Sequence, residues 1–326
     1  MELGTQNIPP RFRADTAVRL ATLRPMQTLT LGKSPLTCTR LAYGCWRLAG
    51  SEGGARRDDA EGIVAVRAAF DAGFTLFDNA DIYGRGECER IFGKAMRDTP
   101  GMRERIVLAT KCGICPPWDG RTHCYDSSAA YIVESVEGSL RRLGTDSVDL
   151  LMIHRPDFLG DPAEIAAAFA QLRTQGKVRE FGVSNFRPSQ LAALQRHCAM
   201  PLIVNQVEVS LAALFTLDDG TLDQCLAERI TPMAWSPLAK GALLGAPKDA
   251  RAEKLQALLA KIAAEKNATP AAIALAWLLK HPSKMQPITG SVNPDRIRES
   301  VRADALELSR GEWYSLLTAA RGTPLP

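Results

Sequence analysis

The chain has 326 residues, of which 46% are hydrophobic and 23% charged, as expected of a globular protein with a core large enough to bury an active site. Its net charge at pH 7 is only +4, which argues against the basic surface that a nucleic-acid partner requires. The longest apolar run, "AAIALAWLLK" from Ala271, is too short to cross a bilayer, so no membrane association is expected.

The first 25 residues form an N-terminal extension that is rich in arginine and poor in acids, and they lack the apolar region of a secretory signal. We expect residues 1–25 to be flexible or draped over the surface, with an organelle transit peptide as the alternative. Residues 26–326 are expected to form one domain. Without a secretory signal, the eight cysteines are expected to stay reduced, in a cytoplasmic protein.

From residue 27 onward, short apolar or β-branched runs alternate with longer segments of helical periodicity. A β-hairpin is expected first, in "QTLTLGKSPLTC". Strands are then predicted at Thr39–Tyr43, Phe74–Asp78, Ile106–Thr110, Val148–His154, Val178–Val183, Ile203–Val207, Pro232–Trp235 and Gln286–Thr289.

Helices are predicted between these strands and after the last one. Proline near helix starts (Pro162, Pro188, Pro270) and glycine just past helix ends (Gly73, Gly144, Gly176) support the assignment. The predicted ranges are Ala60–Asp71, Glu87–Met96, Ala130–Leu143, Ala163–Gln175, Pro188–His197, Leu222–Glu228, Ala252–Lys266, Pro270–Lys280 and Asp295–Arg302.

Repeated strand–helix units predict parallel strands and a closed (β/α)8 barrel, with the hairpin plugging its bottom. A doubly wound open sheet is the alternative fold. It is disfavoured because the glycine fingerprint of such nucleotide-binding sheets is absent after the first strand, where Gly44 is followed by "CWRL".

Polar residues follow the apolar runs of three neighbouring strands: Asp78, Lys111 and His154. Tyr83 lies on the loop after Asp78. Each residue alone has an ordinary explanation, such as a turn, a solvated strand end or a buried histidine. In a barrel, however, the carboxyl ends of the strands meet at the functional rim, so the four together predict an active site.

The four residue types suit proton donation to a carbonyl oxygen. A phenol ordinarily has a pKa of about 10, and a neighbouring ammonium such as Lys111 lowers it. Asp78 can keep Lys111 charged, and His154 can orient a substrate carbonyl toward Tyr83. No side chain supplies a hydride, so a nicotinamide cofactor is implied.

The motifs of the chain resemble those of the aldo-keto reductase superfamily from about Gln27 to Ala303. "LFDNADIYG", "ATKC" and "IHRPD" resemble the segments that carry the family's aspartate, tyrosine, lysine and histidine. "GKVREFGVSNF", "NQVEVS" and "AWSPLAKGAL" resemble its fifth, sixth and seventh strand segments, and "ITGSVNPDRIRES" resembles its adenosine-phosphate loop.

The resemblance implies a role for each matching position. Tyr83 would be the general acid, tuned by Lys111 and Asp78, with His154 placing the carbonyl. Arg296 would pair with a 2′-phosphate, which favours NADPH over NADH, although NADH stays possible because Gly290 stands where many members have lysine. The implied cofactor-binding residues are Gly44, Cys45, Trp46, Asp78, Ser184, Asn185, Gln206, Trp235, Ser236, Leu238, Gly290, Ser291, Arg296, Glu299 and Ser300.

The loop after Lys111, "CGICPPWDGRTHCYDSS", is long and departs from the family pattern. Its aromatic residues are either part of the substrate pocket or rim residues without a role. The C-x-x-C formed by Cys112 and Cys115 suggests a redox-sensitive pair more than a metal site, because no second paired spacing follows. The expected pocket residues are Trp46, Tyr83, Trp118, His123, Tyr125 and His154, and no metal is expected.

The resulting prediction is an NADPH-dependent reductase of small aldehydes or ketones that acts as a monomer or weak homo-oligomer. The chain does not specify the substrate, since the loops that set specificity vary freely on this scaffold. The short tail after the last helix, "GTPLP", suggests an open pocket. The alternatives are a nucleotide-binding regulator with little turnover and an NAD(P)-dependent sugar or polyol dehydrogenase.

Overall fold

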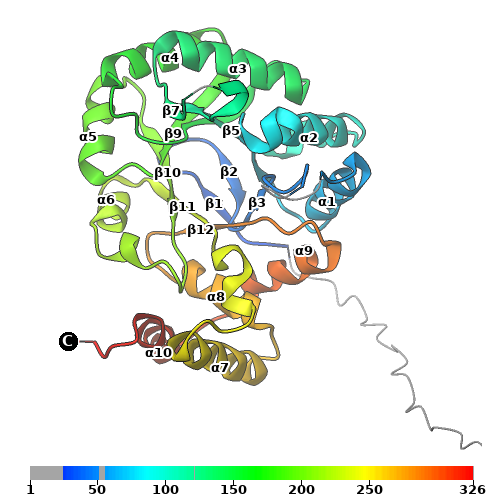
Figure 1. The fold of residues 1–326 in the computed structure, drawn as a ribbon, viewed down its shortest axis with the longest axis vertical. Coiled ribbons are helices and arrows are strands. Elements are labelled where there is room, and N and C mark those ends of the chain that lie inside the picture. Colours follow the sequence, from blue (N-terminus) through cyan, green and yellow to red (C-terminus); the bar gives the residue numbers. More distant parts are fainter. Residues whose placement is uncertain (1–24, 51–55, 121, 326) are drawn as a thin grey trace, which may run out of the picture.

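The computed structural model describes residues 25–50, 56–120 and 122–325, so nearly all of the N-terminal extension lies outside the described residues. Its centre is a closed barrel of eight parallel strands, surrounded by helices (Figure 1). The predicted (β/α)8 barrel is therefore confirmed. The barrel strands are β3 (Ala42–Gly44), β4 (Leu76–Asp78), β5 (Val107–Cys112), β8 (Val148–Ile153), β9 (Val178–Ser184), β10 (Leu202–Glu208), β11 (Thr231–Trp235) and β12 (Gln286–Thr289).

The outer helices follow the predicted order closely. A helix that the predicted ranges omit, α10, packs against α7 outside the ring (Figure 1). The helices are α1 (Asp59–Asp71), α2 (Glu87–Arg97), α3 (Ala129–Leu143), α4 (Pro162–Thr174), α5 (Pro188–His197), α6 (Thr221–Glu228), α7 (Ala250–Glu265), α8 (Pro270–Leu279), α9 (Pro294–Val301) and α10 (Arg310–Arg321).

The predicted helix boundary signals are found in the structure. Pro162, Pro188 and Pro270 stand at the first position of α4, α5 and α8, where a missing N–H costs no hydrogen bond. Gly144 ends α3 with φ 67°, a backbone conformation that glycine adopts without steric cost. Each helix carries the chain back to the amino end of the barrel, so the next strand runs parallel to the one before it.

The predicted hairpin closes the amino end of the barrel. Its strands, β1 (Thr28–Thr30) and β2 (Thr37–Thr39), pair antiparallel. Gly32 in the turn donates its N–H to the hydroxyl of Thr231, the first residue of β11, at 2.9 Å. A Cβ on Gly32 would lie 2.6 Å from the carbonyl oxygen of Ile203, so the hairpin sits directly on the strand starts.

The predicted first strand, Thr39–Tyr43, is wrong at its start. Thr39 belongs to the hairpin, and the barrel strand β3 begins only at Ala42. The chain bends between them because the Thr39 hydroxyl donates to the carbonyl of Leu41 at 2.8 Å, while the Thr39 N–H bonds the Thr75 hydroxyl. The contact between Thr39 and Thr75, 36 positions apart, ends β2, and a local sequence pattern cannot predict such a contact.

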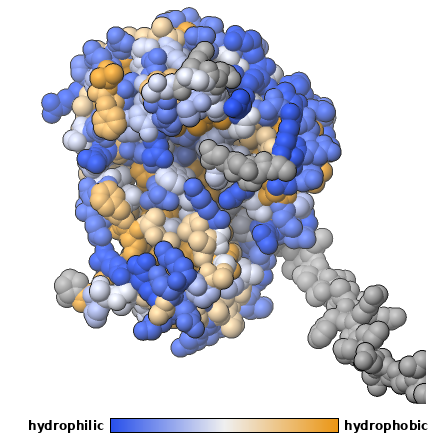
Figure 2. Space-filling view, viewed as in Figure 1, coloured by the Kyte–Doolittle hydropathy of each residue, from blue (hydrophilic) through white to orange (hydrophobic). Residues whose placement is uncertain are grey.

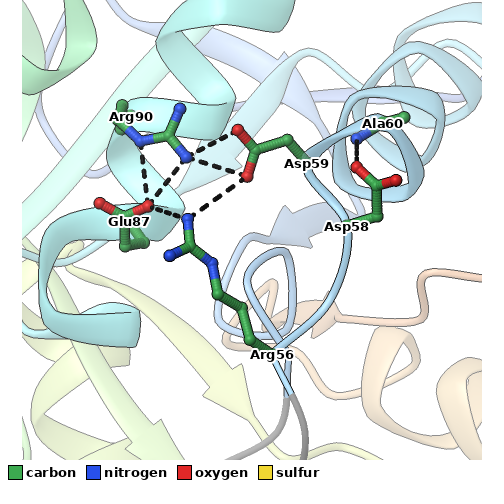
Figure 3. A network of polar contacts seen from close by, with 6 residues as sticks. All are labelled: Arg56, Asp58, Asp59, Ala60, Glu87 and Arg90. Carbon is green, nitrogen blue, oxygen red and sulfur yellow. Dashed lines mark hydrogen bonds and ion pairs between the residues drawn. The ribbon is translucent and has the colours of Figure 1, made fainter.

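An ion-pair network joins α1 to the start of α2, directly after the loop that carries Tyr83 (Figure 3). Arg90 of α2 lies 2.7 Å from the carboxylate of Asp59 in α1 and 2.8 Å from that of Glu87, and Arg56 bonds Glu87 at 2.8 Å. The N-cap of α1 lies beside this network, with Asp58 accepting from the Ala60 N–H. These contacts tie the α2 end of the loop to the start of α1.

On the face shown in Figure 2, hydrophilic residues predominate around the edge, and hydrophobic residues gather below the centre. The most exposed large hydrophobic residues are Phe158, Leu159 and Phe215. They follow β8 and β10, so they belong to loops at the carboxyl ends of the strands. Among the described residues, no helix is both long enough and apolar enough to cross a membrane.

Candidate active site

Lys111 is the centre of a polar cluster inside the barrel. Its side chain, which projects from β5, is completely buried. The ammonium donates to the carboxylate of Asp78 at 2.8 Å, to the carbonyl oxygen of Asn79 at 2.8 Å and to the hydroxyl of Tyr83 at 3.1 Å. An ammonium has three donors, so every one of them is used.

Asp78 is held as firmly as Lys111. It is the last residue of β4, and its side chain is 3% exposed. Its second carboxylate oxygen accepts from the side-chain amide of Gln206 at 2.9 Å. The carboxylate of Asp78 therefore has a cationic and a neutral hydrogen-bond donor, and these offset the cost of burying it.

Tyr83 reaches the cluster because its loop turns sharply. The residue begins a short 3-10 segment, Tyr83–Gly86, in which Gly84, Arg85 and Gly86 all have positive φ. Positive φ at Arg85, a residue with a Cβ, is a strained backbone conformation. This turn places the phenol over Lys111, whose ammonium also lies 4.8 Å from the ring centroid.

His154 faces Tyr83 from the neighbouring side of the barrel mouth. It follows β8 directly, and its backbone N–H donates to the carbonyl of Cys112 at 2.8 Å. The ring centroids of His154 and Tyr83 lie 5.8 Å apart in an edge-to-face arrangement. The Nδ1 atom of His154 is buried without a hydrogen-bond partner among the described residues.

The protonation states follow from burial and from Lys111. Burial raises the pKa of Tyr83 to about 12, the Lys111 ammonium lowers it and Asp78 raises it. The Lys111 ammonium lowers the pKa of the phenol, as predicted, but burial outweighs it, so the pKa of Tyr83 lies above its usual value and not below it. Burial lowers the pKa of Lys111, but Asp78 and Tyr83 raise it more, so the ammonium stays charged. Burial, Lys111 and Arg155 lower the pKa of His154 well below its ordinary value.

At neutral pH the cluster therefore combines a protonated phenol, a charged ammonium and a neutral imidazole. A carbonyl oxygen between Tyr83 and His154 would meet a proton donor and a hydrogen-bonding ring. The Aldo/keto reductase family model matches residues 40–319. The chain belongs to the aldo/keto reductase family.

Relatives and solved structures of aldo/keto reductases resemble the chain over nearly its whole length. The 6-dehydroglucose reductase of Novosphingobium aromaticivorans is 40% identical over 91% of this chain and 96% of its own. The crystal structure of the thermostable aldo-keto reductase Tm1743 has a TM-score of 0.79, with 30% identity over 90% of this chain and all of that one. An aldo/keto reductase from Klebsiella pneumoniae, solved with NADP and acetate, has a TM-score of 0.74, with 27% identity over 92% of this chain and 97% of its own.

Three of the residues that the resemblance implies for cofactor binding, Ser184, Asn185 and Gln206, lie together beside the Lys111 cluster. The Asn185 amide donates to the Ser184 hydroxyl at 2.8 Å and to the His154 carbonyl at 3.3 Å. Ser184 in turn donates to the backbone carbonyl of Gln206 at 2.9 Å. Asn185 has φ 61°, which turns its amide into the barrel mouth. This set of amide and hydroxyl groups fits a carboxamide, which both donates and accepts.

Other residues expected to bind the cofactor lie at the ends of β3 and β11 and on the loops that follow these strands. Trp235 donates its indole N–H to Asn185 at 3.0 Å. Lys240 lies over one ring of Trp46 at 5.6 Å, so these two loops meet across the mouth. Ser236 has φ 51°, and Leu238 packs against both large core clusters. Gly44 is the last residue of β3 and Cys45 follows it, and both are buried beneath the mouth of the barrel.

In the segment that resembles the family's adenosine-phosphate loop, Arg296 is exposed to solvent, whereas other expected cofactor-binding residues are hydrogen-bonded or ion-paired within the protein. Arg296 is exposed, and among the described residues no carboxylate pairs with it. Ser291 accepts the N–H of Asn293 at 3.2 Å, and Gly290 accepts from Arg47 at 3.4 Å. Within α9, the Ser300 hydroxyl donates to the Ile297 carbonyl at 2.7 Å, and Glu299 pairs with Arg302 at 3.3 Å.

The long loop after Lys111 forms a small hairpin that the sequence did not predict. Its strands are β6 (Ile114–Cys115) and β7 (Cys124–Tyr125). Trp118 lies 5.1 Å from the guanidinium of Arg85, near the catalytic loop, while His123 and Tyr125 contact one another at 5.8 Å. In residues 25–50, 56–120 and 122–325, no three His, Cys, Asp or Glu side chains could together hold a metal ion.

Arg155 is a residue at the mouth that sequence reasoning missed. Its guanidinium lies 5.7 Å from the ring of Trp235, although β9 and β10 separate their strands in the barrel. The side chain therefore crosses the mouth rather than pointing outward. The only available signal was its place directly after His154, and adjacent residues at a strand end commonly point in opposite directions.

Proposed function

We propose that this aldo/keto reductase reduces aldehyde or ketone groups to alcohols, with a hydride from NADPH and a proton from Tyr83. The observation that carries the proposal is the 3.1 Å contact between the Lys111 ammonium and the Tyr83 hydroxyl. An acid that must lose a proton in the reaction needs a cation beside the anion it becomes. Lys111, already fixed by Asp78, is that cation.

The protein's part in the reaction consists of orientation and proton transfer. His154, neutral and oriented by its strand, hydrogen-bonds the substrate carbonyl and holds its oxygen near the phenol. When bound, a reduced nicotinamide supplies the hydride. Tyr83, protonated at neutral pH because its pKa is about 12, donates to the oxygen as negative charge develops there. The phenolate that remains is stabilised by Lys111 until it takes a proton from water.

NADPH is the cofactor that the residues favour. The exposed guanidinium of Arg296 is free, among the described residues, to pair with a 2′-phosphate. Ser184, Asn185 and Gln206 would hold the carboxamide, and Trp235 would stack on the nicotinamide ring. The Klebsiella pneumoniae structure with NADP supports the same cofactor class.

A second candidate function is the reduction or oxidation of a sugar or polyol. The similarity to the 6-dehydroglucose reductase favours a hydroxyl-rich carbonyl substrate. Arg155 and Arg85 at the mouth offer donors to several hydroxyl groups, as such a substrate requires. A nucleotide-binding regulator stays as the third candidate, although the complete catalytic cluster argues against it.

The experiment compares NADPH oxidation by the wild type, Tyr83→Phe and Tyr314→Phe, with an aromatic aldehyde and an aldehyde sugar as substrates. Loss of Tyr83 is expected to reduce kcat by roughly 10²–10⁴-fold with NADPH binding retained, as for removal of a general acid. Tyr314 lies on α10 beside Trp313, away from the site, so its variant should resemble the wild type. Tight NADPH binding without turnover on either substrate would favour the regulator instead.

A further inference from the structure

Cys115 and Cys124 lie opposite one another in the hairpin that follows the catalytic lysine strand. β6 and β7 pair antiparallel, and Cys115 and Cys124 are register partners. Directly opposed residues in such a pair have Cβ atoms about 4.5–5.5 Å apart, and a disulfide needs about 3.5–4.5 Å, so a shift of about 1 Å between the two strands is enough to form the bond. We propose that these two thiols are a reversible oxidation site, which takes small disulfides of the glutathione type and forms an intramolecular disulfide.

Exposure distinguishes this pair from the other cysteines. Cys124 is exposed and Cys115 partly exposed, whereas the remaining six cysteines are buried. Reagents from solution therefore reach Cys124 first. Burial raises the pKa of Cys115, the Tyr131 hydroxyl partly offsets this and the Cys124 thiol raises it again. Cys115 is therefore the less reactive thiol and suits the second, resolving step.

The sequence suggested a different pair, Cys112 with Cys115. Cys112 is 1% exposed and lies within β5, and burial raises its pKa well above the ordinary value. Its thiol is inaccessible to an oxidant from solution. The register of β6 and β7 instead gives Cys115 a partner that lies nine positions along the chain.

The reaction balances with glutathione disulfide as oxidant. The Cys124 thiolate attacks one sulfur of glutathione disulfide, and one glutathione leaves. The Cys115 thiolate then attacks Cys124 in the mixed disulfide, and the second glutathione leaves. Two protein thiols are oxidised, one small disulfide is reduced, and the two thiol protons end on the two glutathione molecules.

The disulfide would close a loop that holds Trp118 beside the catalytic segment. The base of the hairpin is already fixed, because Asp126 donates its N–H to Gly113 at 3.2 Å and Tyr131 donates to Ile114 at 3.3 Å. Trp118 is inside the closed loop and lies over Arg85, two residues after Tyr83. Oxidation therefore restrains the side of the mouth next to the proton donor.

The test uses the full-length protein in glutathione buffers of increasing oxidised fraction. Alkylation and mass spectrometry of non-reduced peptides should find one cross-link, between Cys115 and Cys124, that dithiothreitol removes. In Cys115→Ser the mixed disulfide between Cys124 and glutathione should accumulate, because its resolving thiol is missing. Cys198→Ser, at a buried cysteine away from the hairpin, should behave as the wild type.

Several outcomes would overturn the proposal. These are a wild type that keeps all its thiols in oxidised glutathione, a cross-link between Cys112 and Cys115, and a wild type that retains bound glutathione. The readout is chemical and needs no turnover, so it is independent of the proposed reductase activity. A second readout is limited proteolysis of the hairpin, which should slow by at least several-fold on oxidation of the wild type but not of Cys124→Ser.

Discussion

Lys111 and Asp78 form an ion pair in which both side chains are almost completely buried, at 2.8 Å. Replacing Lys111 by Met leaves the carboxylate of Asp78 buried, with the Gln206 amide as its one side-chain hydrogen-bond donor among the described residues. We expect this variant to lose about 3–5 kcal/mol of unfolding free energy, the usual cost of an uncompensated buried charge. Denaturant unfolding measures it.

A double variant separates the charge from the packing. Adding Asp78→Asn to Lys111→Met removes the stranded charge, so the double variant should be more stable than Lys111→Met alone. A double variant that is less stable than either single change would contradict the account of a charge held only by its partner.

The second prediction concerns the pH dependence of reduction. Tyr83 must be protonated to act, and its pKa of about 12 keeps it so across the physiological range. His154 must be neutral, and its pKa is lowered well below the ordinary value by burial, Lys111 and Arg155. We expect kcat/KM for reduction to be flat between about pH 7 and 9, where both groups keep these states. A descending limb near pH 8 would assign the proton donor to another group.

The lowered pKa of His154 also predicts how stability changes with pH. The unfolded chain binds a proton on this residue below about pH 6.5, and the folded protein does so only at lower pH. The unfolding free energy should therefore fall as the pH drops below about 6.5, by at most roughly 1.4 kcal/mol per pH unit from this residue. His154→Phe should weaken that slope in denaturant titrations between pH 7 and 5. An unchanged slope would exclude His154 as its source.

The third prediction concerns cofactor choice. Arg296→Gln removes the exposed guanidinium that would pair with a 2′-phosphate, so KM for NADPH should rise roughly tenfold, which corresponds to about 1.4 kcal/mol. KM for NADH should stay the same, because NADH lacks that phosphate. Arg298→Gln on the same helix is the control, since Arg298 already pairs with Asp295 at 2.6 Å. An equal loss for both cofactors would assign Arg296 another role.

The fourth prediction uses one chemical change at two helix glycines. A Cβ on Gly93 of α2 would press against the backbone of Leu143 at the end of α3, so Gly93→Ala should destabilise by about 1–3 kcal/mol. On Gly311 of α10 the nearest atom would be 3.9 Å away, so Gly311→Ala should stabilise by about 0.5–1 kcal/mol. Thermal unfolding measures the change in stability for each variant. Changes of the same sign for both variants would contradict the packing argument.

Much of the fold could be predicted because its signals are local. Apolar runs ending in Asp78, Lys111 and His154 marked strands and a shared rim, and prolines and glycines marked the helix ends. What failed depends on contacts between distant residues. The bend after Thr39 needs Thr75, and the partner of Cys115 is set by strand register. Likewise the pKa of Tyr83 depends on burial, which a motif does not convey.

The hairpin beneath the barrel packs Leu29, Leu31 and Leu36 into the same buried cluster as the side chains that fill the barrel interior. Gly32 and its neighbours cover the amino end, so a substrate and a cofactor would enter and leave at the mouth, where Trp46, Arg155 and Trp235 lie. If the cofactor binds deeper than the substrate, the product must leave the mouth before the cofactor can leave. For a nicotinamide held by Asn185 beneath the substrate, we expect ordered exchange, with cofactor binding first and departing last. Product-inhibition patterns would reveal this order, and random-order patterns would rule it out.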